Sequence, residues 1–87
     1  MTVLVILYDV KTIPEVKDYK IAIFISNNTY RTNKFRYLQR KYKTKINVTL
    51  SNVPKDLLEQ IAVNIAKLFT DPKEPIHLYT GEKCIVY

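Results

Sequence analysis

The chain has 87 residues, 47% of them hydrophobic, which is enough for one domain with a single core. One glycine, one cysteine and one histidine exclude a glycine-rich phosphate loop, a disulfide framework, a cysteine-based zinc site and a two-histidine metal site within one chain. The formal net charge is +6, no apolar run has the roughly 18 residues of a membrane span, and no basic segment precedes the first apolar run, so we expect a cytoplasmic protein without membrane contact.

The first two segments predict buried strands of a parallel sheet. Residues 2–10, TVLVILYDV, form a near-continuous apolar run that ends in an acid, which is typical of a strand covered on both faces. Residues 11–18 contain Pro14 and are too short for a crossover helix, so they predict a loop or a single helical turn. Residues 19–26, YKIAIFIS, predict the second buried strand.

The next segment predicts a helix over about residues 30–43. Phe35, Leu38 and Tyr42 recur at i, i+3 and i+7, which places them in one apolar stripe. Its N-terminal cap is expected from the polar residues before it, Asn27, Asn28 or Thr29.

Residues 30–45 carry the net charge of the protein. They hold seven basic residues and no acid, whereas the rest of the chain has seven basic and eight acidic residues. Cations around aromatic rings are typical of nucleic-acid surfaces, because cations neutralise phosphates and rings stack on bases. We therefore expect RNA or DNA binding, with phosphate contacts and stacking from Arg31, Lys34, Arg36, Arg40, Lys41, Lys43, Tyr30 and Tyr37. The alternative is a solvated helix face that only keeps the protein in solution.

The second half of the chain predicts a strand, a helix and two further strands. Residues 45–50 alternate and are β-branched, as in a strand. A helix is predicted from Pro54 to about Thr70, because proline is favoured in the first turn and two prolines follow the apolar face. Residues 76–80 predict a strand, and residues 84–87 its hairpin partner.

The element order is β-β-α-β-α-β with an extra C-terminal strand. It predicts a single α/β domain over residues 1–87, with a small, mostly parallel sheet and two helices. The alternative is a ferredoxin-like α+β fold with both helices on one face, whose uncovered face a dimer would bury. A homodimer is also expected because a chain this short leaves an edge strand exposed.

Acidic residues at the predicted strand ends suggest a second kind of site. Asp9 ends the first strand, Asp56 and Glu59 open the second helix, and Glu82 follows the fourth strand. If the first strand lies beside the fourth, these acids share the carboxyl edge of the sheet. Carboxylates there could hold Mg²⁺ or Mn²⁺, which activates water against a phosphodiester. Taken singly, each acid also fits a role in a turn or at a helix N-terminus.

The stretches LVILYDVKTIPEV, KIAIFISNN, LLEQIAVNIAKL and IHLYTGEK resemble the small PIN-like (NYN-type) ribonuclease-related domains over nearly the whole chain. The resemblance implies a metal-dependent nuclease in which Asp9 matches the first metal-binding acid of the family and Glu82 the acid of its last strand. The helix acid of the family falls on Leu58, with Asp56 and Glu59 on either side. Departures at this and other positions make the resemblance fit a binding-only relative as well as an active nuclease.

Two further interpretations stay open. The Tyr-Asp end of the first strand is similar to the CRISPR-associated adaptation nucleases, which are ferredoxin-like dimers, although that family has a long helix where this chain has Pro14. A protein-interaction module, such as a viral or plasmid-encoded inhibitor, would also use a basic helix to cover an acidic partner protein.

Overall fold

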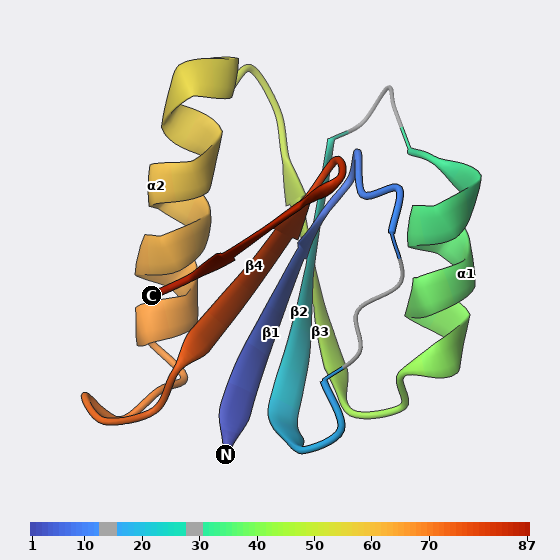
Figure 1. Cartoon of the computed structure of the whole chain (residues 1–87). Helices are drawn as coiled ribbons and strands as arrows, with labels where there is room; N and C mark the ends of the chain where they lie inside the picture. The colour runs from blue at the N-terminus through green and yellow to red at the C-terminus, as the bar shows by residue number, and fades with distance from the viewer. Residues whose placement is uncertain (13–15, 28–30) are drawn as a thin grey trace.

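The computed structural model describes residues 1–12, 16–27 and 31–87, which place a five-stranded sheet between two helices (Figure 1). The elements follow in the order β1 (Thr2–Leu7), β2 (Tyr19–Asn27), α1 (Asn33–Lys41), β3 (Lys45–Leu50), α2 (Lys55–Lys67), β4 (Ile76–Thr80) and β5 (Lys83–Val86). The predicted α/β fold, with two helices and a mostly parallel sheet, is confirmed.

The strands lie in the order β3-β2-β1-β4-β5, with β1 at the centre. β1 pairs in parallel with both β2 and β4, so that Val5 lies opposite Ile23 on one side and Leu78 on the other. β3 pairs in parallel with β2, and β5 pairs antiparallel with β4. From the central strand β1 the chain therefore proceeds through β2 to the edge strand β3. After α2 it continues with β4, which pairs with the other edge of β1.

Both faces of the central strands are covered. Consecutive residues of a strand point to opposite faces, and Val3 to Leu7 of β1 are all fully buried. On the face of α1, the buried cluster contains Leu4, Ile6, Val10, Ala22, Phe24, Phe35, Leu38 and Tyr42. On the face of α2, it contains Val3, Val5, Leu7, Ile23, Ile25, Leu58, Ala62, Ala66, Ile76 and Leu78. The sheet thus has one helix on each side (Figure 1), and the ferredoxin-like alternative with both helices on one face is wrong.

The first strand is shorter than the apolar run that predicts it. β1 ends at Leu7, and the Val10 N–H donates to the Leu7 carbonyl at 3.1 Å, which closes a turn over Tyr8 and Asp9. Val10 remains fully buried because the turn directs it into the cluster under α1. Val10 therefore contributes to the core although it lies outside the strand.

Both helices are also shorter than predicted. α1 begins at Asn33, because Thr32 has an extended backbone and caps the helix, and it ends before Tyr42, which is extended again. Of the expected caps, Asn27 belongs to β2, and residues 28 and 29 lie outside the described part of the chain. α2 ends at Lys67, three residues before Thr70.

β3 and β5 are the two edges of the sheet. Each has hydrogen-bonded strand neighbours on one side only among the described residues. A homodimer through such an edge stays a prediction.

Candidate nucleic-acid interface

The apolar stripe of α1 fixes how the helix is turned. Phe35 and Leu38 are fully buried and Tyr42 is 5% exposed, as the i, i+3, i+7 spacing predicts. The Phe35 ring meets the Phe24 ring of β2 edge-on at a centroid distance of 5.5 Å. The Tyr42 ring meets the Tyr19 ring edge-on at 4.9 Å, and burial, with a smaller contribution from Tyr19, raises the pKa of the Tyr42 phenol. The polar positions of the helix consequently face outward.

Thr32 holds the start of α1 against the end of β1. Its Oγ1 accepts a hydrogen bond from the Phe35 N–H at 3.1 Å and donates one to the Val10 carbonyl at 2.8 Å. Its own N–H donates to the Tyr8 carbonyl at 3.2 Å. Arg31 precedes this anchor, so its backbone position is tied to the carboxyl end of β1.

A polar groove lies between α1 and the edge strand β3. It has a volume of about 450 Å³ and is lined by Arg31, Arg36, Gln39, Arg40, Lys45 and Asn47. We call it the arginine groove. Among the described residues that line it, four are cations and none is an acid.

The alternation of side chains along β3 explains why Lys45 and Asn47 line the arginine groove. Val48 and Leu50 pack on the cluster under α2, so the alternation of the strand turns Lys45 and Asn47 toward α1. There the Gln39 amide donates to Asn47 Oδ1 at 3.0 Å, and the Lys45 ammonium donates to the Gln39 carbonyl. These bonds fix the spacing between the helix and the strand.

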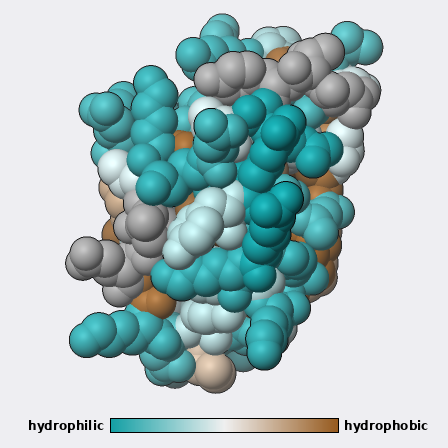
Figure 2. Space-filling view, turned by 90° about the vertical axis from the view of Figure 1, so that its right-hand side faces the viewer, coloured by the Kyte–Doolittle hydropathy of each residue, from teal (hydrophilic) through white to brown (hydrophobic). Residues whose placement is uncertain are grey.

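The cations of the arginine groove have no carboxylate partners in the part of the chain that the structure describes. Ion pairs there involve only Glu74, which meets Lys20 at 3.1 Å and the N-terminal amine at 3.8 Å. Figure 2 looks onto the side of α1 and shows hydrophilic residues across most of it. Within the described ranges, no carboxylate therefore neutralises the positive charge of this face.

Tyr37 of α1 carries an exposed aromatic ring on this face. Its side chain is 53% exposed, and the Lys34 ammonium lies 5.9 Å from its ring centroid. Lys41 lies 5.9 Å from the ring of Tyr42, on the same flank of the helix as Lys34. An exposed ring beside a cation can stack on a base while the cation meets a phosphate.

The predicted binding residues therefore separate into two groups. Arg31, Arg36 and Arg40 line the arginine groove, whereas Lys34, Lys41 and Tyr37 lie on the opposite flank of α1. Lys43 is exposed in the turn before β3, and Tyr30 lies outside the described residues.

Lys45, Gln39 and Asn47 line the arginine groove but are not among the predicted binding residues. The signal that could have found Lys45 and Asn47 is the alternation of KINVTL, which puts both on one face of the strand. Gln39 follows from its place on α1, where it faces the same strand.

The acidic residues expected at the carboxyl edge do not form a metal centre in the described part of the chain. Asp9 Oδ1 accepts from Thr80 Oγ1 at 2.9 Å and from the Gly81 N–H at 3.4 Å. Asp56 and Glu82 are exposed in the first turn of α2 and in the β4–β5 turn, and Glu59 is half-buried. Among the described residues, no three His, Cys, Asp or Glu side chains gather where they could hold a metal ion. As placed here, these four acids do not supply three ligands to one Mg²⁺ or Mn²⁺ ion.

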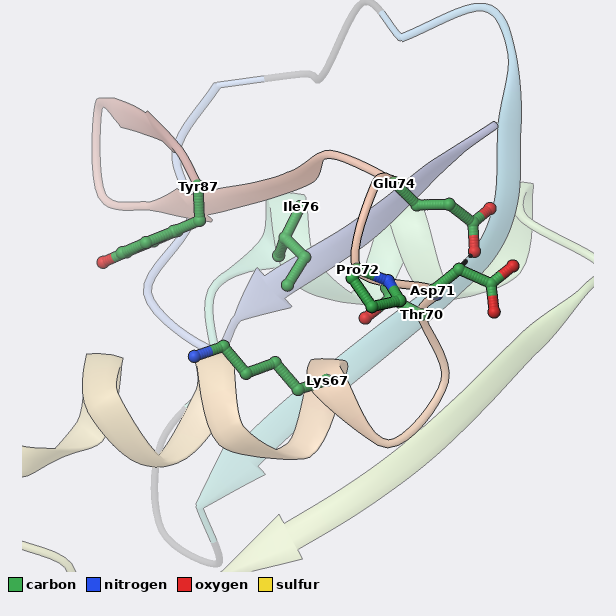
Figure 3. A pocket seen from close by; sticks show the side chains of 7 residues that line it. All are labelled: Lys67, Thr70, Asp71, Pro72, Glu74, Ile76 and Tyr87. Atoms are coloured by element: carbon green, nitrogen blue, oxygen red, sulfur yellow. Dashed lines mark hydrogen bonds between the residues drawn. The ribbon is translucent and has the colours of Figure 1, made fainter.

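A hollow of about 420 Å³ lies at the other end of the sheet, between the end of α2 and the last residue (Figure 3). Lys67 and Tyr87 stand on one side of it and Asp71 and Glu74 on the other. The Asp71 N–H donates to Glu74 Oε1 at 2.9 Å, and Lys20 donates to the same oxygen at 3.1 Å. The bond from Asp71 and then that from Lys20 lower the pKa of the Glu74 carboxyl. The mixed charges of this hollow do not favour a polyanion.

No helix within the described ranges combines the length and the apolar character that crossing a membrane requires. Comparison with known proteins adds no relative: no family model matches the sequence, and no curated protein or solved structure shows significant similarity to it.

Proposed function

We propose that the protein binds single-stranded nucleic acid, RNA or DNA, along the arginine groove. The observation that supports this most strongly is that the four cations of the groove have no carboxylate partner among the described residues. Three of the four are arginines, whose planar guanidinium groups donate in pairs to phosphate oxygens. A chain of phosphates would supply the negative charge that no described residue provides there.

Tyr37 favours a single strand over a duplex. Its ring is exposed on the flank of α1 opposite the groove, where a strand that crosses the helix from the groove can reach it. Bases can stack on such a ring only when they are free of a double helix. Stacking does not depend on base identity, so we expect little sequence preference.

A comparison with α2 indicates that the charge of α1 has a role beyond solubility. The exposed surface of α2 carries Lys55, Asp56 and Lys67, with Glu59 half-buried beside them, so both signs are present. Such a mixed surface is sufficient for solvation. α1 carries only positive charge, which a soluble face does not require.

The salt dependence of binding tests the proposal. We expect the affinity for a fluorescent single-stranded RNA or DNA, measured by anisotropy, to fall linearly on a log–log plot against salt concentration. Replacing Arg31, Arg36 and Arg40 together by Gln should reduce the slope by about 2, because each phosphate contact to a single strand contributes about 0.7.

The control is a triple variant that loses the same charge elsewhere. Lys17, Lys67 and Lys73 are exposed and lie outside the arginine groove, so changing them to Gln should leave the slope nearly unchanged. Equal effects of both triple variants would mean that only net charge matters and would contradict the proposal. Failure of the wild type to bind nucleic acid, together with retention of an acidic protein, would instead assign this face to a protein partner.

A further inference from the structure

A second polar hollow lies at the carboxyl edge of the sheet. It has a volume of about 360 Å³ and is lined by Tyr8, Asp9, Lys11, Asn27, Lys55 and Gly81. We call it the edge crevice. None of these residues lines the arginine groove.

The edge crevice lies at the carboxyl ends of the parallel strands β1, β2 and β4. The crevice is correspondingly lined by the ends of these strands, with Asp9 after β1, Asn27 at the end of β2 and Gly81 after β4. In open α/β sheets, ligands bind in the crevice outside the carboxyl ends of the strands.

The wall formed by Asp9 and Gly81 is held by hydrogen bonds. Asp9 Oδ1 accepts from Thr80 Oγ1 and from the Gly81 N–H, and the Lys11 N–H donates to the Gly81 carbonyl at 2.8 Å. These bonds join the end of β1 to the β4–β5 turn. Within the described residues, Asp9 Oδ2 accepts no hydrogen bond, so this oxygen can take a donor from a ligand.

Two lysines supply positive charge around this acceptor. Lys11 and Lys55 line the edge crevice, are exposed, and pair with no carboxylate in the described ranges. They come from the loop after β1 and from the first residue of α2. A ligand that satisfies both lysines and Asp9 must present an anion and a hydrogen-bond donor together.

We propose that the edge crevice binds a small phosphate ester with free hydroxyl groups, such as a sugar phosphate or a nucleoside monophosphate. Lys11 and Lys55 neutralise the phosphate, and Asp9 Oδ2 accepts a hydrogen bond from a sugar hydroxyl. The volume is at the lower end of the range for small-molecule sites, which suits a ligand of this size. The site is independent of nucleic-acid binding in the arginine groove.

An NMR titration of the ¹⁵N-labelled protein with inorganic phosphate and with ribose 5-phosphate tests this. We expect both to shift the amide signals of Lys11, Lys55 and Gly81, with ribose 5-phosphate binding at least about tenfold more tightly, because it adds a hydrogen bond to a carboxylate. The double variant Lys11→Gln, Lys55→Gln should weaken both ligands about tenfold or more.

Asp9→Asn separates the two parts of the site. Asparagine keeps an oxygen for Thr80 and Gly81 but removes the charge, so the preference for ribose 5-phosphate should fall several-fold while inorganic phosphate still binds. An unchanged preference in this variant would overturn the role of Asp9.

Two further variants complete the test. The double variant Lys17→Gln, Lys73→Gln lies outside the crevice and should behave as the wild type. Shifts confined to the arginine groove, and lost in its triple variant, would place the phosphate there and refute the crevice site. Absence of shifts at the crevice would refute it as well, whatever the outcome for nucleic acid.

Discussion

At the scale of single residues, Asp9 illustrates how one side chain connects distant parts of the chain. Its Oδ1 accepts hydrogen bonds from the Thr80 hydroxyl and the Gly81 N–H, which lie more than 70 residues away in sequence. Gly81 has a φ of +54°, a left-handed conformation that residues with a Cβ adopt only with strain. The turn can therefore point its N–H at Asp9 because a glycine occupies this position.

Removal of the Asp9 carboxylate should destabilise the protein. We expect Asp9→Ala to lower the free energy of unfolding by about 1–3 kcal/mol, because two part-buried donors lose their acceptor. Urea unfolding followed by circular dichroism measures this. Asp9→Asn retains an acceptor oxygen and should cost less, and an Ala variant as stable as the wild type would show that the bonds contribute nothing.

At the scale of the element, α1 depends on its environment to form. Nine residues are too few for a stable isolated helix in water, so packing and capping must stabilise it. Arg40 and Lys41 in its last turn interact favourably with the helix dipole, while its first turn has no acid. Thr32 supplies the N-terminal cap and also anchors the helix to Val10.

Loss of the Thr32 hydroxyl should therefore lower the stability of the whole protein. We expect Thr32→Ala to lower the free energy of unfolding by about 1 kcal/mol or somewhat more, because the Phe35 N–H loses its acceptor. Chemical denaturation provides the measurement, with Thr32→Ser as the variant that keeps the hydroxyl. A loss of the same size in the Ser variant would mean that the methyl group, and not the cap, is responsible.

Much of α1 could be predicted from the sequence, but its exact start could not. The spacing of Phe35, Leu38 and Tyr42 identifies the buried face because helical periodicity is a local property. The sequence predicts Asn27, Asn28 or Thr29 as the cap, whereas Thr32 caps the helix. Thr32 is also held by its bond to Val10, which only the folded chain brings near.

At the scale of the whole molecule, the element order was predictable, whereas the side on which each helix packs was not. Residues 11–18 connect two parallel strands without a predicted helix, so the sequence leaves open which face α1 covers. Asp9 was recognised as an acid at a strand end. Its partner Thr80 could not be identified, because the contact depends on β1 and β4 being neighbours.

Glu74 links the amino ends of the sheet and should give the protein a pH-dependent stability. Its pKa in the folded state is lowered below the ordinary value of 4.5, so folding favours the charged carboxylate. The resulting stability is present above about pH 4.5 and is lost as the pH falls through the lowered pKa. We expect thermal unfolding of Glu74→Gln to depend less on pH in this acidic range than that of the wild type.

The matched control for this measurement is Glu82→Gln, which changes an exposed acid in the β4–β5 turn. It should retain the pH dependence of the wild type. If Glu74→Gln and the wild type lose stability in parallel on acidification, another group is responsible.

The uneven distribution of charge has a consequence for how quickly this protein meets its ligands. The segment of residues 30–45 carries seven positive charges, and the remainder of the chain is close to neutral. The molecule thus has a large dipole directed across the sheet toward α1, and a polyanion in solution exerts a torque on it. Free copies would be turned to present α1 before contact, so association would be fast at low ionic strength and slow as salt screens the field.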